Sequence, residues 1–228
     1  MQDGTERRGL VMGGARGTGQ AIARALAEAG MRLILTDEDA AAAEAAARPL
    51  GATGLACLPM DGGSVGRLAY AASDAAGDLD LLVLALNGAG RAAPTDAEFD
   101  AATHARMRPL FHLVRHFAPA MLARGQGAVL VVLTLPPGPD VWAEAAAGWV
   151  AGAVRALAAD WAASGVTINA LVVRRDESPA LPRFMTRPAP APVPLGRLPQ
   201  PAEIASAALA LCGPAVTGQV LRLDGGSG

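Results

Sequence analysis

The chain has 228 residues, of which 52% are hydrophobic, and its formal net charge is −2. This length accommodates one or two domains with a full hydrophobic core. The near-neutral charge argues against nucleic-acid binding, because such proteins need a basic surface that neutralises phosphates. All 19 residues of the Lys+Arg set are arginines, so no lysine is available for catalysis.

The chain carries no sign of export or membrane insertion. Its N-terminal residues lack the apolar core of a signal peptide, and no apolar run approaches the ~20 residues that span a bilayer. We therefore expect a soluble, cytoplasmic protein without membrane contact. Cys57 and Cys212 lie far apart in apolar segments, and two thiols give neither a disulfide framework nor metal-ligand spacing. We expect both to be buried free thiols.

Short apolar runs alternate along the chain with longer, alanine-rich segments of helical period. The runs predicted as strands are residues 9–12, 32–36, 54–60, 79–86, 128–134, 166–173 and 219–223. The segments predicted as helices are residues 19–30, 38–48, 65–76, 100–124, 142–164 and 201–212.

This alternation predicts the fold. Strands that read as continuous Val, Leu and Ile are typical of a parallel sheet buried on both faces. Seven such strands with six intervening helices predict an α/β fold of the Rossmann type, a single domain over residues 1–228. We expect a doubly wound seven-stranded parallel sheet with helices on both faces. The Pro-rich stretch at about 174–199 is long for a crossover connection, so we expect a lid or substrate loop there.

A glycine-rich turn, MGGARGTG at residues 12–19, joins the first predicted strand to the first helix. Glycine permits a tight turn and a close approach of the backbone to a pyrophosphate, and the helix N-terminus favours the phosphate charge. The second strand ends at Asp37, where a carboxylate accepts hydrogen bonds from the adenosine ribose and repels a 2′-phosphate. Capping of the next helix is the alternative role of Asp37, and the two roles are compatible.

The order of these motifs resembles the short-chain dehydrogenase/reductase family over nearly the whole chain. The glycine turn of that family matches at Gly13, Gly17 and Gly19, with Met12 in place of its threonine. Residues 87–90, Asn-Gly-Ala-Gly, resemble its Asn-Asn-Ala-Gly motif. The most specific matches are the C-terminal segments 194–198, 201–205, 217–221 and 224–226.

The resemblance implies a nicotinamide cofactor, and Asp37 favours NAD(H) over NADP(H). Arg16 is the opposing signal, because an arginine in this turn attracts a 2′-phosphate. Asp61 matches the aspartate that contacts adenine in the family. The cofactor-binding residues that the resemblance implies are Gly13, Arg16, Gly17, Thr18, Gly19, Asp37, Asp61, Asn87, Gly88, Ala89 and Gly90.

The catalytic positions depart from the family pattern. The family uses a tyrosine as general acid/base, a lysine that lowers its pKa, an asparagine of a proton relay and a serine that orients the substrate. The first three positions fall on Ala143, Ala147 and Arg106, and only the serine position keeps a hydroxyl, as Thr134. The single tyrosine, Tyr70, lies before the fourth strand, so no shift of register restores the motif.

Two carboxyl groups are candidate substitutes for the tyrosine. Glu144 is one residue from the tyrosine position and Asp140 lies in the adjoining loop. A carboxyl group whose pKa is raised by an apolar site acts as an acid near neutral pH. The alternative, which we favour, is that both are solvated acids in the first turn of a helix, where the helix dipole stabilises them.

Further polar residues lie near the predicted pocket. Arg174 stands where the family has Pro-Gly, so it either binds an anionic group together with Arg106 or fills the nicotinamide site. For Arg175, a solvated position on the surface is an equally good interpretation. His104, His112 and His116 share one predicted helix, and with no third ligand for the last two we expect no metal site.

Three functions follow from these observations. We favour a catalytically degenerate, NAD(H)-binding subunit that assembles as a homo-oligomer (dimer or tetramer) or as a hetero-oligomer with an active family member. The alternatives are a working NAD-dependent oxidoreductase that uses Thr134 with Glu144 or bound water, and a non-redox enzyme or small-molecule binder that uses the pocket near Arg106, with an anionic small molecule as a ligand. The family pairs the helices predicted at 100–124 and 142–164 across its subunit interface, and the second contains three tryptophans.

Overall fold

A seven-stranded parallel sheet forms the centre of the protein, which a computed structural model describes at residues 7–87, 95–136, 140–175 and 193–227. The strand order is β3-β2-β1-β4-β5-β6-β7, and every pairing is parallel. The strands are β1 Arg8–Met12, β2 Arg32–Asp37, β3 Thr53–Ala56, β4 Leu81–Asn87, β5 Gly127–Leu135, β6 Val166–Arg174 and β7 Val220–Leu223. The expected doubly wound α/β fold is confirmed.

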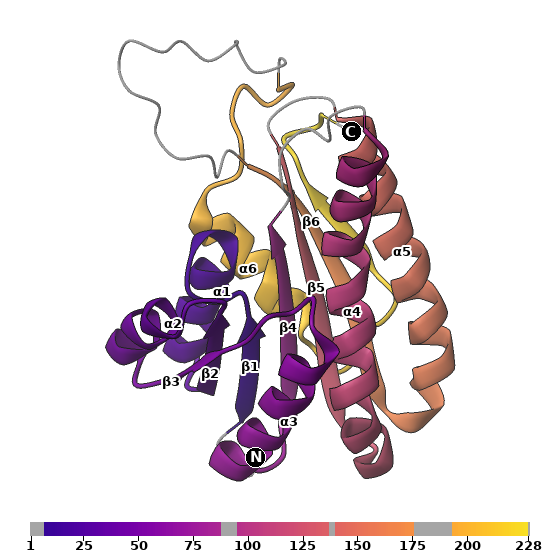
Figure 1. Cartoon of the computed structure of the whole chain (residues 1–228). Coiled ribbons are helices and arrows are strands. Elements are labelled where there is room, and N and C mark those ends of the chain that lie inside the picture. Colours follow the sequence, from indigo (N-terminus) through magenta and orange to yellow (C-terminus); the bar gives the residue numbers. More distant parts are fainter. Residues whose placement is uncertain (1–6, 88–94, 137–139, 176–192, 228) are drawn as a thin grey trace.

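Six α-helices cover the two faces of this sheet (Figure 1). They are α1 Gly17–Glu28, α2 Ala40–Ala47, α3 Gly62–Ala76, α4 Asp96–Arg124, α5 Val141–Trp161 and α6 Pro201–Leu211, with short 3-10 turns η1 Arg48–Leu50 and η2 Ala162–Ser164. One hydrophobic core lies between the sheet and α3, α4 and α5, and a second lies between the sheet and α1, α2 and α6. Strands β1, β2, β5 and β6 are therefore buried along nearly their whole length, as their unbroken apolar sequences predict, whereas the edge strands β3 and β7 are only partly buried.

Two element boundaries differ from the expected ones by four residues, and the others differ by less. Strand β3 ends at Ala56: the Cys57 N–H still donates to the Asp37 carbonyl of β2, but the Leu58 N–H leaves the sheet and donates to the Ser64 hydroxyl of α3. Helix α4 begins at Asp96 and not at residue 100, because the Thr95 hydroxyl and the Glu98 carboxylate form a capping box.

The strand order reverses between β1 and β4, because the chain adds strands on one side of β1 up to β3 and on the other side from β4 to β7. In open α/β sheets the carboxyl ends of the strands at such a switch point form a crevice that binds ligands. The glycine-rich turn follows β1 at this edge. The fold thus places the predicted cofactor residues beside the crevice.

The C-terminal segment is fixed by backbone and ionic contacts. The Leu195 N–H donates to the Gly225 carbonyl over 3.0 Å. Arg197 forms a two-point ion pair with Glu203, at 2.7 and 2.8 Å. The hydrogen bonds from Arg197 and from the Gln200 N–H lower the pKa of Glu203 to about 2. Most of the stretch expected to form a lid, residues 176–192, lies outside the described residues.

Both cysteines are free and buried, as expected. Burial raises the pKa of Cys57, and it raises that of Cys212 to about 11, so both thiols stay protonated near neutral pH. Among the described helices, none is long and apolar enough to cross a membrane.

Candidate functional site

The glycine-rich turn adopts a conformation that only glycine allows at two points. Gly13 and Gly17 have positive φ angles of 78° and 57°. A Cβ atom on Gly13 would lie 2.7 Å from the Ala85 carbonyl oxygen, and one on Gly19 would lie 2.2 Å from the Gly13 carbonyl oxygen. The turn therefore packs directly on β4 and on itself.

Helix α1 starts from this turn without a side-chain cap, whereas Asp61, Thr95 and Asp140 cap α3, α4 and α5. The first amides of a helix need partners, and an anion is one that suits them. The turn and the helix start thus present backbone donors at the switch point.

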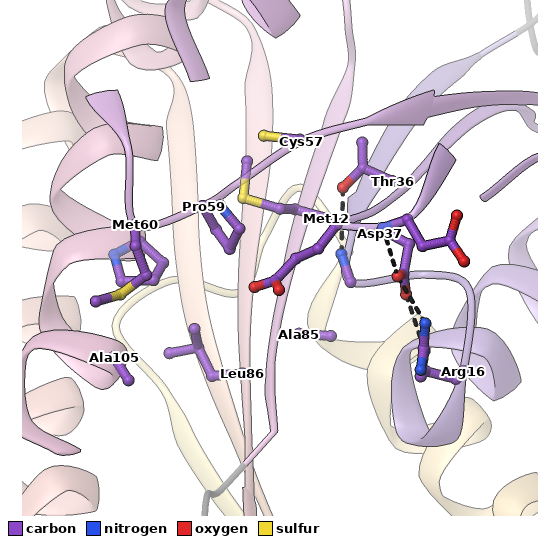
Figure 2. A pocket seen from close by; sticks show the side chains of 14 residues that line it. Met12, Arg16, Thr36, Asp37, Cys57, Pro59, Met60, Ala85, Leu86 and Ala105 are labelled. Carbon is purple, nitrogen blue, oxygen red and sulfur yellow. Dashed lines mark hydrogen bonds and ion pairs between the residues drawn. The ribbon is translucent and has the colours of Figure 1, made fainter. Parts of the chain in front are cut away.

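A cavity of about 470 Å³ opens beside the turn, at the carboxyl ends of β1 to β4 (Figure 2). It is lined by Met12, Gly13, Arg16, Thr36, Asp37, Glu38, Asp39, Cys57, Pro59, Met60, Ala85, Leu86, Ala105 and Pro109. The lining combines apolar side chains with a few polar groups, which is the usual composition of a small-molecule site.

Arg16 and Asp37 form a two-point ion pair at one end of this cavity (Figure 2). Their contacts are Nη2 to Oδ1 at 2.7 Å and Nε to Oδ2 at 3.0 Å, and the Asp39 N–H also donates to Asp37 at 3.1 Å. The hydrogen bond to Asp37 raises the pKa of Arg16. The structure thus brings together the two residues whose sequence signals for cofactor type oppose one another.

The other predicted cofactor residues lie at the same edge. The Asp61 carboxylate accepts from the N–H groups of Gly63 and Ser64, so it caps α3. Asn87 ends β4, in register with Thr134 of β5. Gly88, Ala89 and Gly90 lie outside the described residues.

The positions of the family's catalytic tyrosine and lysine are part of the hydrophobic core. Ala143 is 1% exposed and Ala147 is 4% exposed, and both belong to the cluster between the sheet and α3, α4 and α5. Tyr70 is 79% exposed on α3. The Thr134 hydroxyl is buried and forms a 3.1 Å hydrogen bond with the Thr18 hydroxyl of α1. Arg106 is buried on α4.

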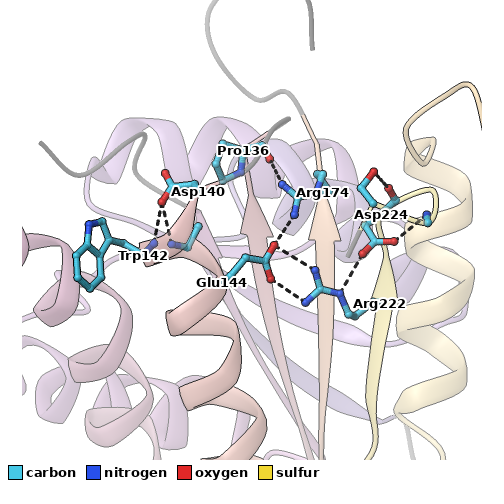
Figure 3. A network of polar contacts seen from close by, with 10 residues as sticks. Pro136, Asp140, Trp142, Glu144, Arg174, Arg222 and Asp224 are labelled. Carbon is cyan, nitrogen blue, oxygen red and sulfur yellow. Dashed lines mark hydrogen bonds and ion pairs between the residues drawn. The ribbon is translucent and has the colours of Figure 1, made fainter. Parts of the chain in front are cut away.

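A charged network occupies the carboxyl ends of β6 and β7 (Figure 3). Arg174 donates to the Glu144 carboxylate and, over 2.9 Å, to the Pro136 carbonyl. Arg222 donates to both oxygens of Glu144, at 3.1 and 3.3 Å, and to Asp224 at 3.0 Å. Successive ionic contacts thereby link Arg174, Glu144, Arg222 and Asp224.

The network affects the ionisation of its members. The hydrogen bond to Glu144 raises the pKa of Arg222. Burial opposes ionisation of Asp224, yet the hydrogen bonds from Arg222 and from the Gly226 N–H keep its pKa below the ordinary value. The general-acid hypothesis for Glu144 requires an apolar site, whereas this carboxylate contacts two guanidinium groups.

The remaining candidate residues are two acids at the start of α5 and the histidines of α4. Asp140 caps α5 through the N–H groups of Trp142 and Ala143, and Glu144 lies in the first turn of α5, so both acids lie at a helix start as the favoured alternative predicts. The expected solvation is wrong for Asp140, which is buried, and Glu144 is held by two arginines. His112 and His116 are 6.4 Å apart between ring centroids. Among the described residues no group of three or more His, Cys, Asp or Glu is placed to hold a metal ion.

The fold and the uncapped turn define a Rossmann-type α/β protein with a cavity at the switch point of its sheet. The family described as "Enoyl-(Acyl carrier protein) reductase" matches residues 13–227 of this chain. The chain belongs to the short-chain dehydrogenase/reductase family.

Several relatives extend over nearly the whole chain. The galactitol 2-dehydrogenase (L-tagatose-forming) of Cereibacter sphaeroides is 36% identical, with 95% of this chain and 92% of the relative aligned. The 3-oxoacyl-acyl-carrier-protein reductase of Vibrio harveyi is 31% identical, with 95% of each chain aligned. A crystal structure of 3-ketoacyl-(acyl-carrier-protein) reductase from Brucella melitensis complexed with NADH has a TM-score of 0.82 at 28% identity, covering 96% of this chain and 97% of that one.

Proposed function

We propose that this chain is an NAD(H)-binding, cytoplasmic member of its family that does not transfer hydride and acts as a structural or regulatory subunit. The observation that carries the proposal is the burial of Ala143 and Ala147 in the core, at the positions of the acid and its tuning cation. General acid/base catalysis contributes about 10²- to 10⁴-fold to a rate, and electrostatic tuning adds to it. Loss of both groups removes most of the chemical acceleration.

Two contacts weigh against a working oxidoreductase built on Thr134 and Glu144. The Thr134 hydroxyl is bonded to Thr18, and the Glu144 carboxylate is bonded to Arg174 and Arg222. A proton donor must reach the substrate oxygen, and neither group is free of internal partners. Arg174 likewise binds an internal carboxylate, which weighs against its use for an anionic substrate.

The adenosine half of the cofactor fits the cavity. Backbone donors of the glycine turn suit the pyrophosphate, and Asp37 suits the ribose hydroxyls. The NADH complex of the Brucella melitensis reductase supports a nicotinamide cofactor in a fold of this kind.

Titration of the purified protein with NADH, alongside rate measurements on panels of carbonyl compounds and secondary alcohols, tests the proposal. We expect binding without turnover. Ala143→Tyr with Ala147→Lys is expected to destabilise the protein and restore no activity, because both side chains would enter a packed core. Robust turnover by the wild-type protein that is lost in Glu144→Gln would establish the oxidoreductase instead.

The preference for NAD(H) over NADP(H) is proposed from Asp37, whose carboxylate stands where a 2′-phosphate would lie. We expect Asp37→Asn to weaken NADH binding about 10-fold, since hydrogen bonds to charged groups contribute about 1.5–3 kcal/mol. The same change releases Arg16 from its ion pair and is expected to tighten NADPH binding. Calorimetry with both cofactors measures this, with Arg16→Gln as the control that weakens NADPH alone. Tighter NADPH than NADH binding by the wild-type protein would refute the preference.

The oligomer is proposed to form through α4 and α5. Phe99 and Trp142, on these helices, are 42% and 43% exposed and pack edge to face at 4.9 Å. On α5 a Cβ atom at Gly148 or Gly152 would meet nothing within 4 Å, so a second helix has room to approach. Trp161 is buried in its own subunit.

Light scattering is expected to show a dimer or tetramer at micromolar concentration. Gly152→Arg is expected to shift it to monomer, while Gly30→Asn, on the opposite face of the sheet, leaves it unchanged. A monodisperse wild-type monomer would refute the oligomer. A homo-oligomer that captures no family member from its native cells would refute only the mixed assembly.

A further inference from the structure

The cavity at the switch point has a charged end and an apolar end. The Arg16–Asp37 pair forms the charged end. Figure 2 shows Met60, Leu86 and Ala105 at the opposite end. Because Asp37 suits the ribose hydroxyls and the glycine turn suits the pyrophosphate, the apolar end is left for the base of a bound dinucleotide. Apolar side chains pack on the face of any base, so a choice between bases requires a hydrogen-bonding group at this end.

The aspartate that the family resemblance assigns to adenine is not part of the cavity lining. The Asp61 carboxylate is absent from the lining residues, and its two oxygens accept from N–H groups at the start of α3, at 3.1 and 3.0 Å. Two further carboxylates of the lining, Glu38 and Asp39, directly follow Asp37, and both residues are exposed to water, which competes for their hydrogen bonds.

Helix α4 supplies a backbone acceptor at the apolar end. Ala105 and Pro109 both line the cavity, about one helical turn apart. A regular α-helix bonds the carbonyl of residue 105 to the N–H of residue 109, and proline has no N–H. Because helix carbonyls point towards the C-terminus, the Ala105 carbonyl oxygen points from one lining residue towards the other. This oxygen therefore lacks its regular helical donor beside the space that the base would fill.

An acceptor at this position distinguishes adenine from the other purines. The 6-amino group of adenine donates hydrogen bonds, whereas hypoxanthine and guanine carry an oxygen acceptor at the same position. An oxygen that faces the Ala105 carbonyl would leave both acceptors without a donor, and a polar group that is buried without a partner costs free energy.

Building on the proposed function, we propose that Pro109 sets the base specificity of the cofactor site, because it leaves the Ala105 carbonyl available to accept a hydrogen bond from the 6-amino group of adenine. The ligand class is then dinucleotides of adenine, and dinucleotides of hypoxanthine or guanine bind weakly. Pro109 acts through the carbonyl, as a positioning residue of the site.

Calorimetric titration of the whole chain with NADH and with its hypoxanthine analogue, reduced nicotinamide hypoxanthine dinucleotide, tests this. We expect the wild type to bind NADH at least about tenfold more tightly, which corresponds to about 1.4 kcal/mol. Pro109→Ala supplies the missing N–H to the Ala105 carbonyl, so we expect the ratio of the two affinities to fall to about threefold or less. The ratio is the informative quantity, because the smaller side chain also enlarges the cavity, which affects both ligands alike.

Pro119→Ala is the matched control, because Pro119 also lies inside α4 but is exposed and does not line the cavity. We expect it to keep the wild-type ratio of affinities, and Glu38→Gln to do the same. Both proline variants are expected to unfold at no lower urea concentration than the wild type, because alanine is the more favourable residue inside a helix.

The outcomes separate this inference from the proposed function. Equal affinities of the wild type for the two dinucleotides would overturn the inference and leave NAD(H) binding intact. An unchanged ratio in Pro109→Ala, or an equal fall in Pro119→Ala, would also overturn it. A ratio that falls in Glu38→Gln instead would assign the amino group to that carboxylate. Failure of both dinucleotides to bind would overturn the proposed function, and the inference with it.

Discussion

Gly19→Ala is expected to abolish nucleotide binding and to lower the free energy of unfolding. The added Cβ atom would lie 2.2 Å from the Gly13 carbonyl oxygen and 3.0 Å from the Ala85 side chain. Backbone atoms cannot move aside as a flexible side chain does, so α1 and the turn must separate. Overpacking of this kind costs about 1–3 kcal/mol, and displaced turn amides no longer converge on a pyrophosphate.

Urea unfolding and NADH titration of the same variant measure the two effects. Gly63→Ala is the matched control, because a Cβ atom there makes ordinary contacts at 3.5 Å near the start of another helix, α3. We expect it to bind NADH like the wild type, with stability unchanged or slightly raised. Equal NADH affinities for the two variants would mean that the turn is not the binding element.

The fold could be predicted from the sequence because it depends on patterns that are local in the chain. Seven apolar runs and the helical segments between them predicted the order of elements, and the continuous hydrophobicity of the central runs predicted strands that are buried on both faces. The start of α4 was misplaced although its signal is present: Thr95 and Glu98 have the spacing of a capping box. The end of β3 depends on the Cys57 and Leu58 amides, whose partners lie on other elements.

The position of the candidate site at this edge of the sheet was predictable for the same reason, whereas the contacts between residues within the site were not. The glycine spacing and Asp37 can be read from one stretch of sequence, yet the bond between Arg16 and Asp37 depends on two strand ends lying side by side. The sequence did not predict Arg222 as a partner of the Glu144 carboxylate, nor Asp224 as a partner of Arg222. Arg222 and Glu144 are 78 residues apart, and only the placement of β7 beside β6 brings them together.

That long-range pairing leads to a stability prediction: Glu144→Gln is expected to lower the free energy of unfolding by about 2–3 kcal/mol. Removing one partner of a buried pair leaves the other charge uncompensated, and the Arg174 side chain is 5% exposed. The figure is smaller than the ~3–5 kcal/mol of a fully buried pair, because the Glu144 side chain is 38% exposed and partly screened by water.

Glu203→Gln is the matched control, because it also removes the charge of an Arg–Glu pair within one helix turn of a helix start. Both side chains of that pair are about half exposed, and glutamine preserves the capping box, so we expect almost no change in stability. Arg174→Met added to Glu144→Gln is expected to recover part of the lost free energy of unfolding, since it removes the guanidinium charge that has no counter-ion in the single variant. Urea unfolding of the wild type and these three variants measures the effect: equal stabilities of Glu144→Gln and Glu203→Gln would show that water screens both ion pairs alike.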